Sequence, residues 1–179
     1  PHYPHLLGLH AGRAALDRRT TVVTSEHVQF ALRTAIDKAQ SSIQTDYLKS
    51  ITSSREEALY RQVLLACAIA KTDEVGWFYP KDVRPPLEKI LGRKYNIESF
   101  ARHLHAFSQE MRGPVLIVDK KHARPRFRFE NPLMQPYVLI RGIAEGLIAQ
   151  SDAMSDEDKE KRRKERANPD QPGLFESLG

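Results

Sequence analysis

Apolar residues in the first part of the chain recur every three or four positions, which is the spacing of one helical face. The pattern runs over residues 2–17 and again over residues 25–44, where Thr24 is a favourable N-cap. The second stretch keeps six apolar residues on one side: Val28, Leu32, Ala35, Ile36, Ala39 and Ile43. We therefore expect two helices that pair through these faces and need a further layer to be stable.

Helical spacing returns after residues 45–54, which are rich in Ser and Thr and predict a linker. Tyr47, Leu48 and Ile51 suggest that part of this segment docks on the fold or prolongs the preceding helix. Ser54 to Glu57 spells a capping box and predicts the start of a helix that ends before the aromatic turn at residues 76–80. Pro85 and Pro86 suit the first turn of a short helix that ends at Leu91. Asn96 should cap a third helix, with one apolar face formed by Ile97, Phe100, Leu104, Phe107 and Met111.

The period changes to that of a strand after Gly113 and Pro114. Residues 115–118 and 126–129 predict an antiparallel hairpin, in which the Phe and Arg residues of Arg126–Phe129 face opposite sides and the two Phe side chains pack inward. A last helix should follow Asn131 and Pro132 and end near residue 150. The charged segment after it has few large apolar residues, which is typical of a flexible tail.

Three helices followed by a two-stranded wing is the order of a winged helix-turn-helix. The predicted fold class is mainly α, within α+β. The predicted division is a helical pair over residues 1–44, a linker over 45–54, a winged helix domain over 55–150 and a flexible charged tail over 151–179.

Charge is unevenly distributed along the chain. Lys and Arg total 28 against 23 for Asp and Glu, but residues 151–179 hold 6 of the basic and 8 of the acidic side chains. The basic excess therefore lies in residues 1–150. Between Arg112 and Arg128 the sequence has six basic residues and one acid, Asp119, which predicts a local positive patch.

A positive patch on a winged helix-turn-helix predicts binding to double-stranded DNA. On the third helix, Glu98, Arg102, His105, Gln109 and Arg112 are spaced to project from one polar face. We expect DNA contacts from nine residues: Arg102, His105, Gln109, Arg112, Lys120, Lys121, Arg124, Arg126 and Arg128. The alternative is a protein-interaction or oligomerisation module, in which the same surface meets an acidic partner or a neighbouring subunit.

Catalytic and metal-binding patterns are poor, so we expect no enzyme activity from this chain alone. No Gly-rich segment ends in Gly-Lys-Ser or Gly-Lys-Thr, so no phosphate-binding loop is predicted. The single cysteine, Cys67, lies on an apolar face and cannot form an internal disulfide. The histidines lack partners at a metal spacing, and we expect neither a metal site nor a catalytic residue.

The first 45 residues resemble the end of the helical lid of AAA+ ATPases, in particular the secretion-type ExeA and transposition-type TniB ATPases. Pro1-His2-Tyr3, the run from His5 to Leu16, and Val22 to Val28 carry this resemblance. It implies that the chain is the C-terminal part of an ATPase whose upstream core would bind ATP and Mg²⁺. His2 stands where these proteins carry a nucleotide-sensing Arg, and a neutral imidazole is a weaker partner for phosphate.

The stretch from Arg126 to Leu133 resembles the junction between the wing and the last helix in ATPase-linked winged helices. The predicted module as a whole resembles the one that follows the lid in origin-recognition initiator ATPases, where it binds DNA or a partner. At the other end of the chain, Gln171, Leu174 and Phe175 resemble the core of bacterial peptides that bind the sliding clamp. The longest apolar run, residues 63–70, is far shorter than the roughly 20 residues that span a bilayer, so no membrane segment is predicted. The expected location is the cytoplasm.

Overall fold

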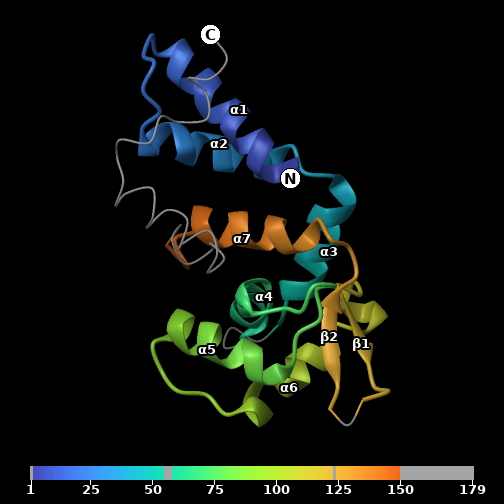
Figure 1. Cartoon of the computed structure of the whole chain (residues 1–179). Helices are drawn as coiled ribbons and strands as arrows, with labels where there is room; N and C mark the ends of the chain where they lie inside the picture. Colours follow the sequence, from blue (N-terminus) through green and yellow to red (C-terminus); the bar gives the residue numbers. More distant parts are fainter. Residues whose placement is uncertain (1, 55–57, 123, 150–179) are drawn as a thin grey trace.

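The protein is mainly helical, with one small antiparallel sheet, as the sequence predicts (Figure 1). The computed structural model describes residues 2–54, 58–122 and 124–149, with side chains from His5 onward. Its elements are α1 (His2–Asp17), α2 (Ser25–Asp37), α3 (Ser41–Ile51), α4 (Tyr60–Ile69), α5 (Pro80–Leu91), α6 (Ile97–Ala106), a 3-10 turn η1 (Glu110–Arg112), β1 (Leu116–Asp119), β2 (Arg126–Phe129) and α7 (Met134–Ala144).

The predicted helical pair is formed by α1 and α2 at one end of the molecule (Figure 1). Small buried alanines on both helices, among them Ala15 and Ala31, let their backbones approach closely. Thr24 caps α2 as expected, and its backbone N–H donates to Nδ1 of His27 at 3.1 Å. The pair packs onto the rest of the fold mainly through α2 and α7.

The predicted helix over residues 25–44 is wrong, because α2 ends at Asp37 and α3 starts at Ser41. The side-chain amide of Gln44 donates to the carbonyl oxygens of Ile36 at 3.2 Å and Ala39 at 2.9 Å. These carbonyls lie in the last turn of α2 and just after it, where the regular donors of a continuing helix are missing. The apolar period therefore continues through a turn that one side chain stabilises.

Residues 45–51, predicted to belong to a linker, form most of α3. This helix buries Ile43, Tyr47 and Ser50, and the first two belong to the same apolar cluster as α4 and α7. The ring of Tyr47 meets that of Tyr137 edge to face, with centroids 5.4 Å apart. The apolar positions Ile43, Tyr47 and Ile51, each four residues apart, therefore outweigh the Ser and Thr content of the segment.

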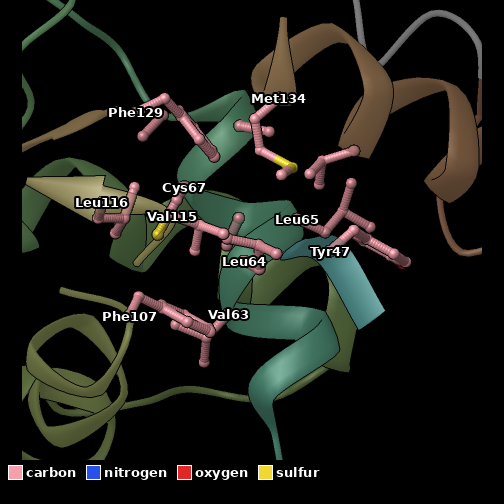
Figure 2. Packing of buried hydrophobic residues seen from close by; sticks show 14 of the residues in the cluster. Tyr47, Val63, Leu64, Leu65, Cys67, Phe107, Val115, Leu116, Phe129 and Met134 are labelled. Carbon is pink, nitrogen blue, oxygen red and sulfur yellow. The ribbon is translucent and has the colours of Figure 1, made fainter. Parts of the chain in front are cut away.

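The core is built around α4, whose residues 63–68 are all buried. Figure 2 shows Val63, Leu64 and Leu65 surrounded by side chains from other elements, including Phe107 and Met134. Gly142 on α7 faces Leu65 so closely that a Cβ atom there would lie 2.6 Å from Cδ1 of Leu65. The start of α4 is Tyr60, and most of the predicted capping box, residues 55–57, lies outside the described residues.

The prediction that Pro85 and Pro86 occupy the first turn of a helix is wrong, because α5 starts at Pro80. Pro80 takes the first helical position, where its missing N–H is harmless. Asp82 accepts a hydrogen bond from the Tyr79 backbone N–H at 2.9 Å and so closes the first turn. The last helix, α7, ends at Ala144, before the left-handed Gly146.

The predicted hairpin is present, with Leu116 opposite Phe129 and Asp119 opposite Arg126. Phe127 and Phe129 are buried, as the alternation with Arg predicts. Phe78, in the segment between α4 and α5, pairs with Phe127 through two backbone hydrogen bonds of 2.8 Å. Phe78, which precedes α5, therefore adds a one-residue bridge to β2 of the sheet. The hairpin loop, of which residues 120–122, 124 and 125 are described, extends beside α6 (Figure 1).

Candidate nucleic-acid interface

The exposed polar side of α6 holds three of the residues expected there, Glu98, Arg102 and His105. The helix ends at Ala106, so the prediction that Gln109 and Arg112 continue this face is wrong. Residue 113 is a glycine at φ 135°, and the chain reaches it through the 3-10 turn η1 rather than through further α-helix. Met111, predicted to be apolar core, is 89% exposed for the same reason.

Arg112 is bound within the fold. Its guanidinium carbon lies 3.6 Å from the centre of the Tyr60 ring, and Nη1 donates to the carbonyl oxygens of Ser50 at 3.0 Å and Thr52 at 2.6 Å. These contacts join the end of α3 to the start of α4. The guanidinium therefore serves a structural role that the sequence pattern did not reveal.

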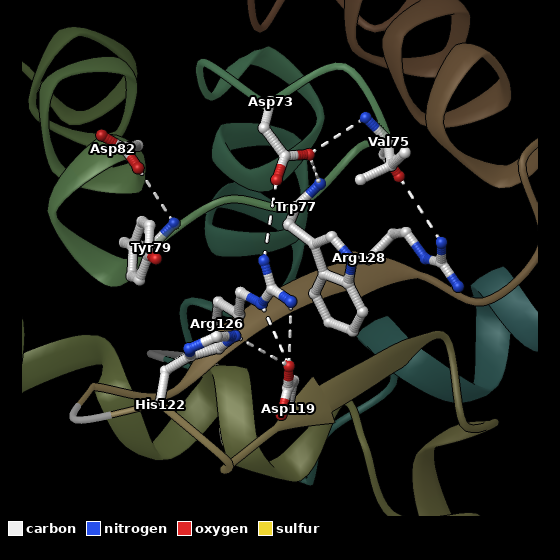
Figure 3. Close-up of polar contacts among 9 residues, drawn as sticks. All are labelled: Asp73, Val75, Trp77, Tyr79, Asp82, Asp119, His122, Arg126 and Arg128. Carbon is white, nitrogen blue, oxygen red and sulfur yellow. Dashed lines mark hydrogen bonds and ion pairs between the residues drawn. The ribbon is translucent and has the colours of Figure 1, made fainter.

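Arg126 and Arg128 line the outer surface of the hairpin and lie against Trp77 (Figure 3). Their guanidinium carbons lie 4.7 Å and 4.9 Å from the centre of the indole ring. Arg126 also forms an ion pair with Asp119, in which Nη2 and Oδ2 are 3.0 Å apart, and its Nη1 lies 3.8 Å from Oδ2 of Asp73. The predicted positive patch is thus partly neutralised at Arg126.

The Trp77 contact is a feature that sequence reasoning missed. Asp73 fixes the turn that presents this side chain, because its Oδ1 accepts the backbone N–H groups of Val75 at 3.1 Å and Trp77 at 2.8 Å. Gly76 supplies the left-handed residue of the turn at φ 86°. The signal in the sequence was the aromatic turn itself, together with two arginines spaced for one side of a strand.

Three predicted cations, Lys120, Lys121 and Arg124, are exposed in the hairpin loop. Among the described residues none of these three side chains has an ion-pair partner. The backbone N–H of Lys121 donates to Oδ1 of Asp119 at 2.9 Å, which shapes the start of the loop. This N–H group and the Arg126 guanidinium lower the pKa of the Asp119 carboxyl from its ordinary value.

A groove of about 780 Å³ separates α6 from the hairpin loop, and we call it the α6–hairpin groove. Its lining comes from the start of α5, from α6 and from the hairpin. The apolar lining residues are Tyr79, Pro80, Ile97, Ala101, Leu104, Pro125 and Phe127. The polar ones are Lys81, Glu98, His105, His122 and Arg124. The exposed part of α6 and the cationic loop therefore form the two walls of one concave surface.

Other titratable groups are buried away from this groove. His103 lies on the buried side of α6, and the centre of its ring is 4.7 Å from that of Tyr60. Burial, reinforced by the charge of Arg102, lowers the pKa of His103. Burial raises the pKa of the Cys67 thiol, so this cysteine is a core residue. In the part of the chain that the structure describes, no three His, Cys, Asp or Glu residues are grouped so that they could hold a metal ion.

Two groups of predicted site residues are outside this description. The side chain of His2 lies outside the described residues, as do Gln171, Leu174 and Phe175. Within the described ranges, no helix has both the length and the apolar content to cross a bilayer. Comparisons with protein-family models, with curated proteins and with solved structures gave no match for the chain.

Proposed function

We propose that residues 58–149 form a winged helix that binds double-stranded DNA. The order of elements supports this proposal: α4, the paired residue Phe78, α5, α6 and then the hairpin. In such a module the third helix enters the major groove and the wing reaches the neighbouring backbone. Here α6 takes the first role, and the hairpin loop takes the second.

The observation that carries the proposal is the group of exposed cations beside an exposed polar helix. Lys120, Lys121 and Arg124 have no ion-pair partner among the described residues, so their charges are available to phosphates. Arg102 and His105 on α6 face solvent and offer donors to base edges or phosphates. We assign Arg126 and Arg128 to support of the hairpin surface and Arg112 to the packing of α3 and α4, rather than to direct DNA contact.

Charge reversal in the hairpin loop tests the proposal. The variant Lys120→Glu, Lys121→Glu, Arg124→Glu should weaken binding to any duplex at least about tenfold and reduce the salt dependence of log K by about 3. A matched control reverses three exposed cations on the α1–α2 pair: Arg13, Arg33 and Lys38. Fluorescence anisotropy with a labelled duplex measures both. Equal losses of DNA affinity in the two variants would show that net charge alone causes the effect. An unchanged affinity of the loop variant would reject the proposal.

On the resemblance of residues 1–45, we propose that this module belongs to an AAA+ ATPase, with α1 and α2 as the end of its lid. Movement of the lid with nucleotide state would then carry the winged helix toward or away from DNA. A phosphate-binding loop encoded ahead of Pro1, together with DNA affinity that changes when that longer protein binds ATP and Mg²⁺, is the expected result. Longer sequence without such a loop would contradict this assignment.

Exposed apolar residues favour a second candidate, a protein contact made by the α1–α2 pair. Leu16 is 66% exposed, Val22 65% and Phe30 56%, on α1, on the connection and on α2 respectively. Exposed apolar surface of this kind marks contact sites. Replacing Leu16 and Phe30 by Gln should abolish self-association or subunit binding measured by light scattering after gel filtration. DNA affinity should not change.

A further inference from the structure

The lining of the α6–hairpin groove does not match the surface of an intact duplex. Its apolar part includes the half-buried Ile97 and Ala101 on α6, Pro80 on α5 and Pro125 beside the hairpin loop. Stacked base pairs offer phosphates, sugars, polar base edges and isolated thymine methyl groups, so duplex DNA would leave most of this surface without an apolar partner. The flat face of an unstacked base would cover it.

We propose that this groove takes an unpaired nucleobase, so that the protein prefers DNA in which the duplex is interrupted. The inference rests on the proposed DNA-binding function and adds a substrate class to it. A volume of about 780 Å³ lies within the roughly 300–1,000 Å³ of sites that enclose single small molecules. The groove therefore has room for a nucleotide unit and not for a double helix.

Tyr79 supplies an aromatic surface in the lining of the groove. Its backbone N–H is held by Asp82 at 2.9 Å, and Nζ of Lys81 lies 5.7 Å from the centre of its ring (Figure 3 shows the Asp82 contact). The ring is thus presented from a capped helix start rather than from a free loop. Bases stack on such rings whatever their identity, which makes the site tolerant of sequence.

The positions of the polar side chains around the groove orient the bound nucleotide. His122 and Arg124 come from the hairpin loop and Lys81 from α5, and these groups complement the phosphates on either side of the base. His122 is only partly engaged, since its Nε2 lies 3.5 Å from Oδ2 of Asp119. Lys120 and Lys121 continue the positive surface along the loop. The strand backbone therefore follows the hairpin.

Glu98 lies on the α6 side of the groove, opposite the hairpin loop. Its carboxylate on α6 repels phosphate but accepts hydrogen bonds from the N–H groups of a base edge. The base edge therefore faces α6. An acidic peptide with an apolar side chain is the competing occupant, and Glu98 disfavours it because the carboxylates of the peptide and of Glu98 repel each other.

The experiment measures the affinity of the whole chain for three fluorescent DNAs of equal length at one salt concentration. They are a uniform duplex, a duplex that opens into a fork of unpaired bases, and a single strand. The expected order places the fork at least about fivefold tighter than the uniform duplex. Ala101→Leu fills the groove and should remove the fork preference, measured as the ratio of fork affinity to duplex affinity in the same variant.

Two variants complete the design. Ser99→Leu makes a similar apolar change at an exposed position of α6 outside the groove lining and should keep the fork preference. Tyr79→Leu keeps apolar bulk and removes the aromatic face, so it should weaken fork binding severalfold even if Ala101→Leu does not fold. Circular dichroism checks the folding of each variant.

Each result decides the proposal. Equal affinity for fork and duplex, or a fork preference that survives in Ala101→Leu, overturns the nucleobase site and leaves duplex binding in place. Failure to bind any of the three DNAs rejects both the site and the proposed function. A fourth probe is a labelled synthetic peptide with the sequence of residues 171–178, which combines apolar side chains with one acidic residue, Glu176. If this peptide binds, loses affinity in Ala101→Leu, and no DNA preference is seen, the groove belongs to a peptide.

Discussion

The guanidinium carbon of Arg112 lies 3.6 Å from the centre of the Tyr60 ring, so this cation joins two helices of the core instead of extending the surface of α6. The same side chain donates to the carbonyl oxygens of Ser50 and Thr52 at the end of α3. These carbonyls have no intrahelical donor, and Arg112 reaches them from 60 residues or more away in sequence. The contact therefore joins η1 to the end of α3 and to the start of α4.

Arg112→Met should lower the free energy of unfolding by about 1–3 kcal/mol, because it removes a cation–π contact and hydrogen bonds from a charged donor. DNA affinity per folded molecule should be unchanged. Urea unfolding and fluorescence anisotropy measure the two quantities. Arg102→Met, on the exposed side of α6, is the matched control and should show the opposite pattern: weaker DNA binding with little loss of stability. If Arg112→Met behaved like Arg102→Met, the structural role assigned to Arg112 would be wrong.

Asp119→Asn should lower the urea midpoint at pH 7, because the carboxylate accepts from the Lys121 N–H and pairs with Arg126. Its pKa is lowered in the folded protein, so its contribution is complete above the ordinary value of 3.8 and is lost as the pH falls through the lowered pKa. The difference between the two proteins should therefore shrink only below about pH 4. A difference that disappears between pH 7 and pH 5 would point to another group.

His103→Phe should make stability less dependent on pH. Burial lowers the pKa of His103 below its ordinary value of 6.5, so the unfolded chain takes up a proton that the folded protein does not. Stability should fall as the pH drops below 6.5, by at most about 1.4 kcal/mol per pH unit for this one group. Phe is an aromatic replacement that can keep the edge-to-face contact with Tyr60 and cannot be protonated. Unfolding curves at pH 7.5 and 5.5 measure the slope, and an unchanged slope would rule out His103 as its source.

Gly142→Ala should cost about 1–3 kcal/mol, since the added Cβ would lie 2.6 Å from Cδ1 of Leu65. The same change at Gly8 on α1 meets no atom within 4 Å and should stabilise the protein by about 0.5–1 kcal/mol. Combining Gly142→Ala with Leu65→Ala separates the clash from other effects. Urea unfolding should show non-additive costs in the double variant, and simple additivity would mean that the two residues do not interact.

The sequence predicts those elements whose apolar residues keep a regular period. The start of α2 at Thr24, the buried side of α6 and the inward packing of Phe127 and Phe129 follow directly from spacing. Period alone does not locate the breaks, however. The apolar period of residues 25–44 continues through residues 38–40, although the helix breaks there. The turn at these residues depends on the Gln44 side chain, which donates to the Ala39 carbonyl oxygen.

The candidate site is predictable only in part for a related reason. A count of charges identifies the basic segment, and the loop cations Lys120, Lys121 and Arg124 are exposed as expected. Which cations are engaged depends on neighbours that are distant in sequence: Tyr60 for Arg112, and Trp77 and Asp73 for Arg126. The groove is likewise hidden from the sequence, because its walls come from α5, α6 and the hairpin.

The pairing of Phe78 with Phe127 sets the spacing of those walls. Phe127 lies on β2 and lines the groove, while Phe78 is followed at once by Tyr79 and by the start of α5. Two backbone hydrogen bonds of 2.8 Å therefore connect one side of the opening to the other at its base. This pairing fixes the start of α5 against β2, and we therefore expect the groove to discriminate between occupants by their thickness.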